Sequence, residues 1–309
     1  MNSIALLIGG LVGLTIGAEL MVRGAAALAR RLGLTPLVIG LTVIAFGTSA
    51  PELVVSALAS HRGSGAIAVG NVIGSNLCNL AFILGACALI RPLTASHAVI
   101  RREVPLLIGA TTLGAALLLD HDITFIEGFV LLVILFGLTT QTVRQARADT
   151  DQSYDHRTHP APSMAIAVSL TVVGLGLLMY GSHLFVEGAV TIARQLGWSE
   201  KLIGLTIVAI GTSLPELATS VVAVIKGEND VAVGNVVGSS LFNILGILGV
   251  TGLMGNAFIP ELSLLDLGML LGVTIAVLPL VRSGGEISRR EGAGLLLTYV
   301  GYTLWLILG

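Results

Sequence analysis

One segment of this chain occurs twice, and each copy carries a glutamate inside an apolar sequence. Residues 40–85 align without a gap with residues 204–249, at an offset of 164, and 25 of the 46 aligned positions are identical. The two glutamates are Glu52 and Glu216. A carboxylate at membrane depth costs roughly 2.5–3.5 kcal/mol on insertion scales, so it is a functional candidate by default. Any fold of this chain has to account for two such residues in equivalent places.

The composition indicates a membrane protein. Of the 309 residues, 54% are apolar and only 11% are charged, and the mean hydropathy is +0.95. Soluble proteins carry about a quarter charged residues. The apolar stretches are long and continuous rather than alternating, which favours helices over a transmembrane barrel. We therefore predict an all-α polytopic membrane protein. No basic, aromatic-rich patch suggests nucleic-acid binding, and Cys78 and Cys87 are interpreted as packing residues of one apolar segment.

Apolar runs and the polar breaks between them predict ten transmembrane helices. The only long hydrophilic stretch, residues 144–162, is interpreted as a cytoplasmic linker between two five-helix repeats, residues 1–143 and residues 163–309. The N-terminal segment lacks a basic region and a small-residue cleavage site, so we expect a first span there rather than a signal peptide. The predicted spans are Ile4–Met21, Thr35–Ser60, Ala66–Ile90, Val104–Leu119, Ile123–Val143, Ser163–Val186, Leu202–Lys226, Val231–Leu253, Leu262–Val281 and Gly292–Leu308.

The distribution of Lys and Arg predicts the orientation of these spans. With the N-terminus outside, the internal loops hold 13 of these residues and the external loops hold only three, which are Arg62, Arg194 and Lys201. Positive residues accumulate on the cytoplasmic side of membrane proteins. We therefore expect both termini outside, in the cytoplasmic (inner) membrane of a prokaryote.

Five spans per half is an odd number, so the second half enters the membrane from the opposite side. The repeat also extends upstream of the main copy, because Gly24 and Arg30 recur as Gly188 and Arg194. Inverted repeats of this kind occur in many secondary transporters, whose substrate site lies near the midplane at the interface of the repeats. The sequence therefore predicts ten transmembrane helices arranged as two inverted five-helix repeats around a central site.

Each copy contains the pattern Gly-Thr-Ser-x-Pro-Glu, which places oxygen atoms beside the glutamate. Pro51 has no N–H to donate to the carbonyl of residue 47, and its ring disturbs the preceding turn. Backbone carbonyls around residues 45–48, and around residues 209–212 before Pro215, therefore become available as ligands. Hydroxyl residues three and four positions before a glutamate share its helical face. They are Thr48 and Ser49 in the first copy, and Thr212 and Ser213 in the second.

The next span of each copy adds a Ser and an Asn spaced i, i+4, and therefore on one helical face. Oxygen ligands with carboxylates suit Ca²⁺ and Na⁺, whereas soft metals call for Cys, Met or His. Two glutamates would balance the charge of one divalent ion, and a proton on one of them would relieve their repulsion before a cation arrives. The added residues are Ser75 and Asn79, and Ser239 and Asn243.

Structural roles are the alternatives for several of these residues. A proline kink with nearby Thr and Ser occurs in many membrane helices without a ligand role, and paired Ser and Asn residues also join neighbouring helices. Asn71 and Asn235, which follow a glycine in each copy, are interpreted as helix-packing or capping groups rather than ligands. The two glutamates differ from these residues, because a carboxylate in mid-span rarely has a structural role.

The twin Gly-Thr-Ser-x-Pro-Glu segments, each followed by Gly-Asn, Gly-Ser and a further Asn, resemble the alpha repeats of the calcium/cation antiporter superfamily. The resemblance covers the whole chain and is to the prokaryotic sodium/calcium exchangers in particular. It implies that Glu52 and Glu216 are ligands shared by Ca²⁺ and Na⁺, and that the first and sixth spans slide across a steadier core. The other ligands it implies are Thr48, Ser49, Ser75 and the carbonyl of Ala45 for one set of Na⁺ positions, Thr212, Ser213, Ser239 and the carbonyl of Ala209 for the other set, and Asn79 and Asn243 for the central position.

The functional hypothesis is a secondary active antiporter that exchanges Ca²⁺ for Na⁺ by alternating access. Its partners are inorganic cations and the lipid bilayer. No phosphate-binding loop for ATP and no HExxH motif is present, so we expect neither an enzyme nor a cofactor. A Ca²⁺/H⁺ antiporter of the same fold is the alternative, because the glutamates themselves can titrate, although Asn243 replaces an Asp found in some branches of the family. A passive cation channel is the second alternative. A monomer suffices for this mechanism, and the sequence leaves the oligomeric state open.

Overall fold

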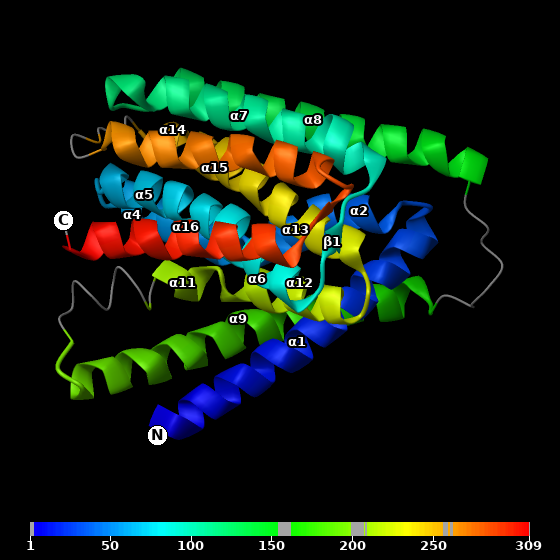
Figure 1. Cartoon of the computed structure of the whole chain (residues 1–309), viewed down its shortest axis with the longest axis horizontal. Coiled ribbons are helices and arrows are strands. Elements are labelled where there is room, and N and C mark those ends of the chain that lie inside the picture. The colour runs from blue at the N-terminus through cyan, green and yellow to red at the C-terminus, as the bar shows by residue number, and fades with distance from the viewer. Residues whose placement is uncertain are drawn as a thin grey trace.

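The computed structural model describes residues 3–153, 162–198, 207, 209–255, 259 and 262–308, and these residues form a helical bundle with one two-stranded sheet (Figure 1). The helices of the first half are α1 (Ser3–Leu32), α2 (Pro36–Ile39), α3 (Ala45–Thr48), α4 (Ala50–His61), α5 (Gly65–Leu77), α6 (Leu84–Ile90), α7 (Val104–Leu117) and α8 (Phe125–Ser153). Those of the second half are α9 (Met164–Gln195), α11 (Ala209–Thr212), α12 (Leu214–Ile225), α13 (Asn229–Leu241), α14 (Leu248–Leu253), α15 (Leu264–Arg282) and α16 (Arg289–Leu308).

Short π-helical and 3₁₀ segments join several of these helices. A π-helix forms where the backbone makes a wider turn than the α-helix; it is rare and is frequently found at functional sites. Two of the π-helices contain Asn79 and Asn243. The segments are the π-helices η1 (Gly40–Ile44), η2 (Cys78–Ile83), η3 (Val99–Glu103) and η6 (Phe242–Ile247), and the 3₁₀ helix η4 (Leu118–Asp120).

Eight helical segments of the described residues are long and apolar enough to cross a membrane, and a bent pair, Pro36–Thr48 with Ala50–His61, makes a ninth. The pair bends by 46° at the break before Pro51. The protein is therefore a helical polytopic membrane protein, as predicted. The predicted span Leu202–Lys226 begins outside the described residues, and what is described of it ends in the shorter apolar helix α12.

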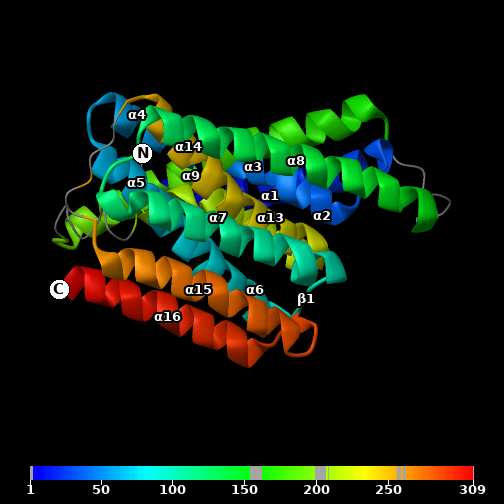
Figure 2. The same ribbon diagram turned by 90° about the horizontal axis from the view of Figure 1, so that it is seen from above.

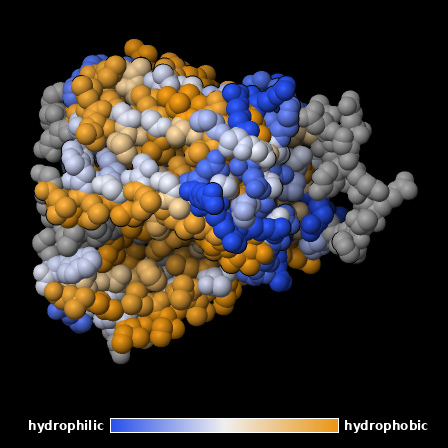
Figure 3. Space-filling model, in the orientation of Figure 1, coloured by the Kyte–Doolittle hydropathy of each residue, from blue (hydrophilic) through white to orange (hydrophobic). Residues whose placement is uncertain are grey.

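The central layer of the bundle consists of the two segments that follow the glutamates. Gly65–Ile90 and Asn229–Leu253 bury 72% and 78% of their most apolar window, whereas Arg289–Leu308 on the periphery buries 11%. In Figures 1 and 2, α5 and α13 lie inside the bundle, with α7 and α8 on one side of them. The exposed flank is largely hydrophobic, and hydrophilic residues gather toward the end where β1 lies (Figure 3). This surface suits a protein surrounded by lipid.

Helices α1 and α9 lie side by side along the lower side of the bundle in Figure 1. Their contact is close because glycines face the partner backbone. A Cβ atom on Gly17 would lie 2.7 Å from the backbone nitrogen of Leu178, and one on Gly181 would lie 2.7 Å from that of Leu14. Only glycine allows backbones to approach so closely. The predicted first and sixth spans are therefore packed on each other as one pair.

The loops that the charge distribution places on the same side of the membrane meet in the structure. The short strands β1 (Leu93–Thr94) and β2 (Glu286–Ile287) pair antiparallel and join the loops after α6 and α15, both predicted inside. At the other end, the backbone N–H of Ile259 donates to the carbonyl of His121 at 2.7 Å, and both residues lie in loops predicted outside. In contrast, helix α8 continues through Arg144 to Ser153, so the first part of the predicted linker is helical.

Candidate cation site

The two glutamates occupy equivalent positions just after a helix break. Ser49 ends α3 and precedes α4, and Ser213 holds the same place between α11 and α12. Proline is the second residue of each following helix, where its missing N–H breaks no helical hydrogen bond. Glu52 and Glu216 thus lie in the first turn of α4 and α12. The positive end of a helix dipole favours a negative group at this position.

Hydrogen bonds cross between the two repeats at this point. The Ser49 hydroxyl donates to Oε1 of Glu216 at 2.9 Å, and the Ser213 hydroxyl donates to Oε1 of Glu52 at 3.1 Å. Both carboxylates are 1% exposed. Each glutamate is therefore held by the serine of the opposite half, which brings the two predicted carboxylates into one buried cluster.

Several buried oxygen atoms of the predicted ligands have no hydrogen-bond donor among the described residues. They are Oε2 of Glu52, Oε2 of Glu216, and the amide oxygens Oδ1 of Asn79 and Asn243. No described Lys or Arg forms an ion pair with either glutamate. Leaving a buried acceptor unpaired costs about 1–3 kcal/mol, and more for a charged group. A cation bound between these atoms would satisfy them and neutralise the carboxylates.

The remaining predicted ligands surround the same breaks. Thr48 is fully buried, and its hydroxyl lies 3.2 Å from Oδ1 of Asn235 and 3.4 Å from the carbonyl of Ala45. That carbonyl accepts from the N–H of Ser49 at 3.0 Å and faces the Ser239 hydroxyl at 3.5 Å, so it lies between the two halves.

Three further members of the predicted ligand set lie on α5 and α11. Ser75 is 3% exposed on α5, and Thr212 is half-buried at the end of α11. Ala209 begins α11, and its side chain lies outside the described residues.

The cluster is an oxygen site rather than a site for a soft metal. Within the described ranges, no three His, Cys, Asp or Glu side chains gather in a way that would hold a metal ion. The charge comes from two carboxylates only, and the other groups are neutral hydroxyl, amide and carbonyl oxygens. Such a set matches Na⁺ and Ca²⁺, which bind hard oxygen ligands.

From the sequence, Asn71 and Asn235 are interpreted as helix-packing or capping groups, and in the structure both contact the glutamate segments. The amide nitrogen of Asn71 donates to the backbone carbonyl of Glu52 at 3.1 Å, and that of Asn235 donates to the carbonyl of Glu216 at 3.3 Å. The spacing in the sequence already indicates that these residues face the site. Asn71 lies four residues before Ser75 and therefore on the same face of the helix.

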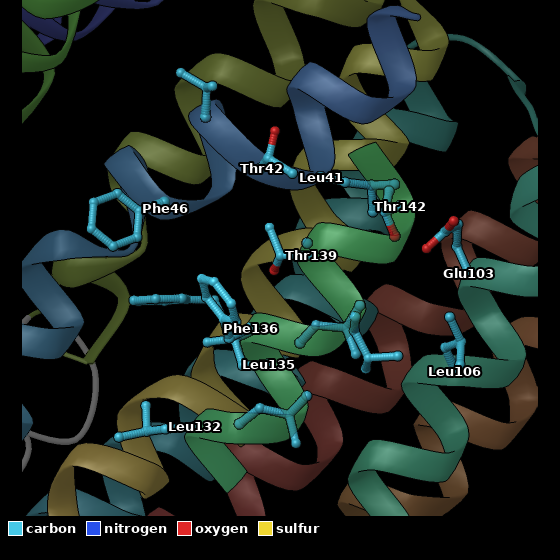
Figure 4. A pocket seen from close by; sticks show the side chains of 16 residues that line it. Leu41, Thr42, Phe46, Glu103, Leu106, Leu132, Leu135, Phe136, Thr139 and Thr142 are labelled. Atoms are coloured by element: carbon cyan, nitrogen blue, oxygen red, sulfur yellow. The ribbon is translucent and has the colours of Figure 1, made fainter. Parts of the chain in front are cut away.

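A further buried carboxylate, Glu103, lies away from this cluster and was not anticipated from the sequence. It is 3% exposed, and its Oε1 lies 3.7 Å from Nε of Arg102. Glu103 lines a lateral, mainly apolar cavity of about 600 Å³, together with residues of η1, α3, α8 and α13. In the view of Figure 4, Glu103 and Phe46 lie on opposite sides of this cavity. None of the predicted ligands lines this cavity, so it is separate from the glutamate cluster.

The chain is similar to known sodium/calcium exchangers over nearly its whole length. Residues 2–142 and 166–308 match the sequence model of the family described as sodium/calcium exchanger protein. The chain is 36% identical to the inner membrane protein YrbG of Escherichia coli K12 over 98% of its own length and 95% of the relative. It is 31% identical to the sodium/calcium exchanger MaX1 of Methanosarcina acetivorans over 96% of each chain. A structure of the sodium-calcium exchanger NCX_Mj, soaked with zero Na⁺ and Ca²⁺, superimposes with a TM-score of 0.86 at 30% identity over 98% of both chains.

Proposed function

This chain belongs to the sodium/calcium exchanger family, and on that basis we propose that it exports Ca²⁺ in exchange for Na⁺ at one central site. Members of this family are transporters of inorganic cations, so the protein is an antiporter of the Na⁺/Ca²⁺ exchanger type and not an enzyme. The export direction follows the usual inward Na⁺ gradient. Any net charge moved per cycle would add about 2.3 kcal/mol per 100 mV of membrane potential.

The observation that carries the proposed site is the pair of crossed hydrogen bonds between the repeats. Ser49 reaches Glu216 and Ser213 reaches Glu52, so one buried cluster receives a carboxylate from each half. We assign the two glutamates as ligands that Ca²⁺ and Na⁺ share, which makes their binding competitive. The neutral ligands assigned with them are Thr48, Thr212, Ser75, Ser239, Asn79, Asn243 and the carbonyls of Ala45 and Ala209.

The proposed transport cycle is alternating access between two inverted repeats of five spans each. Its support is that the elements recur at one offset: α4 and α12 begin at Ala50 and Leu214, and α5 and α13 end at Leu77 and Leu241, each 164 residues apart. The close pairing of α1 with α9 supports a movement in which these two helices slide together across the core. One chain contains the whole cluster, so a monomer suffices.

We place the protein in the cytoplasmic membrane with both termini outside. The relative YrbG carries the description of an inner membrane protein. Single cysteines in place of Ser3 and Ser283 test the orientation, because the native Cys78 and Cys87 are at most 2% exposed. A membrane-impermeant maleimide should label cysteine at position 3 in intact cells with the outer membrane opened, and cysteine at position 283 only after the inner membrane is permeabilised. The reverse pattern would overturn the assignment.

Flux in proteoliposomes tests the proposed exchange. Vesicles containing the purified protein are loaded with Na⁺, with K⁺ or with an acidic buffer. They are then diluted into a neutral ⁴⁵Ca²⁺ medium that lacks the loaded cation, so that one outward gradient is imposed at a time. We expect rapid uptake only from Na⁺-loaded vesicles. Uptake driven by the pH gradient alone would indicate a Ca²⁺/H⁺ antiporter, and uptake without any counter-ion would indicate a channel.

A further inference from the structure

The central helices carry a third polar residue on the face that holds the proposed ligands. Asn71, Ser75 and Asn79 follow one another at intervals of four residues, as do Asn235, Ser239 and Asn243. Residues at this spacing lie above one another on one side of a helix. The second and third members of each series belong to the proposed site. The first member has no ligand role there, although Asn235 is fully buried.

Both first asparagines make the same contacts with the helix that carries the glutamate. The amide nitrogen of Asn71 reaches the carbonyl of Glu52 at 3.1 Å and the hydroxyl of Ser56 at 2.9 Å. The Ser56 hydroxyl in turn donates to the carbonyl of Ala68 on α5 at 3.3 Å. These bonds fix the rotation of α4 about its axis relative to α5, and thereby the direction in which the Glu52 side chain points.

The second repeat reproduces the arrangement. The amide nitrogen of Asn235 reaches the carbonyl of Glu216 at 3.3 Å and the hydroxyl of Ser220 at 3.0 Å. Two copies that share about half of their residues have kept the same pair of bonds in the same places. Helix packing alone does not require that such a bond be made to the glutamate backbone in both halves.

Asn235 has an additional contact, which reaches the other repeat. Its Oδ1 lies 3.2 Å from the hydroxyl of Thr48, closer than the carbonyl of Ala45 at 3.4 Å. A threonine hydroxyl has one proton and two lone pairs. A hydroxyl that binds a cation through a lone pair must direct its proton elsewhere, and Oδ1 of Asn235 is a buried acceptor for it. Asparagine thereby keeps the oxygen of Thr48 free for the cation.

We propose that Asn71 and Asn235 are positioning residues of the cation site: both orient the glutamate helix of their own repeat, and Asn235 also orients the hydroxyl of Thr48 from the opposite repeat. This inference rests on the proposed function, because it concerns the affinity of the same site. Groups that orient a metal ligand typically change metal affinity 10- to 100-fold when they are removed.

A double-mutant cycle on Na⁺-driven ⁴⁵Ca²⁺ uptake tests the proposal. The variants are Asn235→Ala, Asn71→Ala and Thr48→Val, the two combinations with Thr48→Val, and the surface control Asn229→Ala, which removes an exposed bond to Thr94. We expect each buried asparagine variant to raise the half-saturating Ca²⁺ concentration about 10- to 100-fold, with little change in the maximal rate per folded protein. Asn229→Ala should match the wild type.

The combinations separate positioning from packing. Asn235→Ala with Thr48→Val should fall short of the product of the single effects by about threefold or more, since both remove the same arrangement. Asn71→Ala with Thr48→Val should give the full product, because Asn71 bonds Glu52 and Ser56 and not the hydroxyl of Thr48. Full multiplication in both pairs, or unchanged half-saturation in folded Asn235→Ala, would overturn the proposal.

A conservative variant covers the case in which Asn235→Ala fails to fold. Asn235→Asp keeps the oxygen that faces Thr48 but replaces the amide donor to the Glu216 carbonyl by an acceptor. Only the orientation of the glutamate helix is then changed, so Thr48→Val should have the same fold-effect in this background as in the wild type. A changed effect would contradict the assigned role of Oδ1. Failure of the proposed function is recognised separately, because the wild type would then show no Na⁺-driven uptake at all.

Discussion

At the scale of single residues, the site depends on donors that come from the opposite half of the chain. Two carboxylates in a dry interior repel each other, and each is stabilised here by one serine hydroxyl and by the start of its own helix. Because the hydroxyl donors are exchanged between repeats, neither half can build the site alone. Among the described residues, one oxygen of each glutamate has no donor, which leaves that oxygen available to a cation.

Removing the charge of either glutamate should abolish exchange. Glu52→Gln or Glu216→Gln leaves one carboxylate for a divalent cation and places amide N–H groups where acceptors are required. The loss of Na⁺-driven ⁴⁵Ca²⁺ uptake should exceed the roughly 10- to 100-fold cost of losing a group that merely orients a ligand. Size-exclusion chromatography checks that the variants are folded. Transport at the wild-type rate by either one would refute its role as a ligand.

The supporting serines should have smaller effects that are alike in both halves. Ser49→Ala and Ser213→Ala each deprive a carboxylate of a serine hydroxyl donor from the other repeat. We expect the half-saturating Ca²⁺ concentration to rise about 10-fold in each. Ser283→Ala, which loses an exposed bond to Glu291, serves as the control. An effect in only one of the two serine variants would contradict the symmetric arrangement.

The sequence allowed prediction of the residue types at the site but not of how they pair. Intervals of three and four residues indicate which side chains share a face of one helix, and on that basis they grouped Ser49 with Glu52. They carry no information about contacts between helices, so the bond from Ser49 to Glu216 was not foreseen. The same limit explains why Asn235 was interpreted as a packing residue, since its contact with Thr48 joins residues far apart in the chain.

At the scale of helices, hydropathy predicted the apolar part of each helix rather than the residues at which the helix begins and ends. The predicted first span stops at Met21, whereas α1 continues to Leu32, because a helix can extend beyond the apolar region with arginines in its last turn. It ends before Gly33, whose φ of 62° is readily adopted only by glycine. The π-helices around Asn79 and Asn243 have no signature in composition and were not predicted.

The pairing of α1 with α9 predicts a strong dependence on individual glycines. In Gly17→Ala the new Cβ would lie 2.7 Å from the nitrogen of Leu178 and 2.8 Å from the carbonyl of Gly174, so the helices must separate. Overpacking of this kind typically costs about 1–3 kcal/mol. We expect a lower unfolding temperature in detergent. Gly9→Ala on the same helix is the matched control, because its Cβ would meet only Leu184 at 3.9 Å. Equal unfolding temperatures for the two variants would contradict the close packing.

At the scale of the whole molecule, the two halves share their pattern of helices but differ at their ends. Nζ of Lys226, after α12, lies 2.5 Å from Oε1 of Glu19 on α1, and this ion pair joins α1 to the core. The residues that correspond at an offset of 164 are Arg62 and His183. Among the described residues, Arg62 forms no ion pair, and His183 lies 3.9 Å from Glu187 of its own helix. Among the described residues, an interhelical ion pair therefore occurs at the Lys226 position and not at the equivalent Arg62 position.

This asymmetry predicts a sided effect of Lys226→Gln. The pair lies at the end predicted to be intracellular, so its loss should favour opening of the site to that side. Half-exposed ion pairs contribute about 0.2–1 kcal/mol, which corresponds to at most about a fivefold change in a two-state equilibrium. In membrane vesicles of known orientation, the half-saturating Ca²⁺ concentration should fall at the intracellular face and rise at the extracellular face. Arg23→Gln, which removes only a contact within α1, should change neither face, and equal shifts at both faces for Lys226→Gln would mean that the ion pair does not control access.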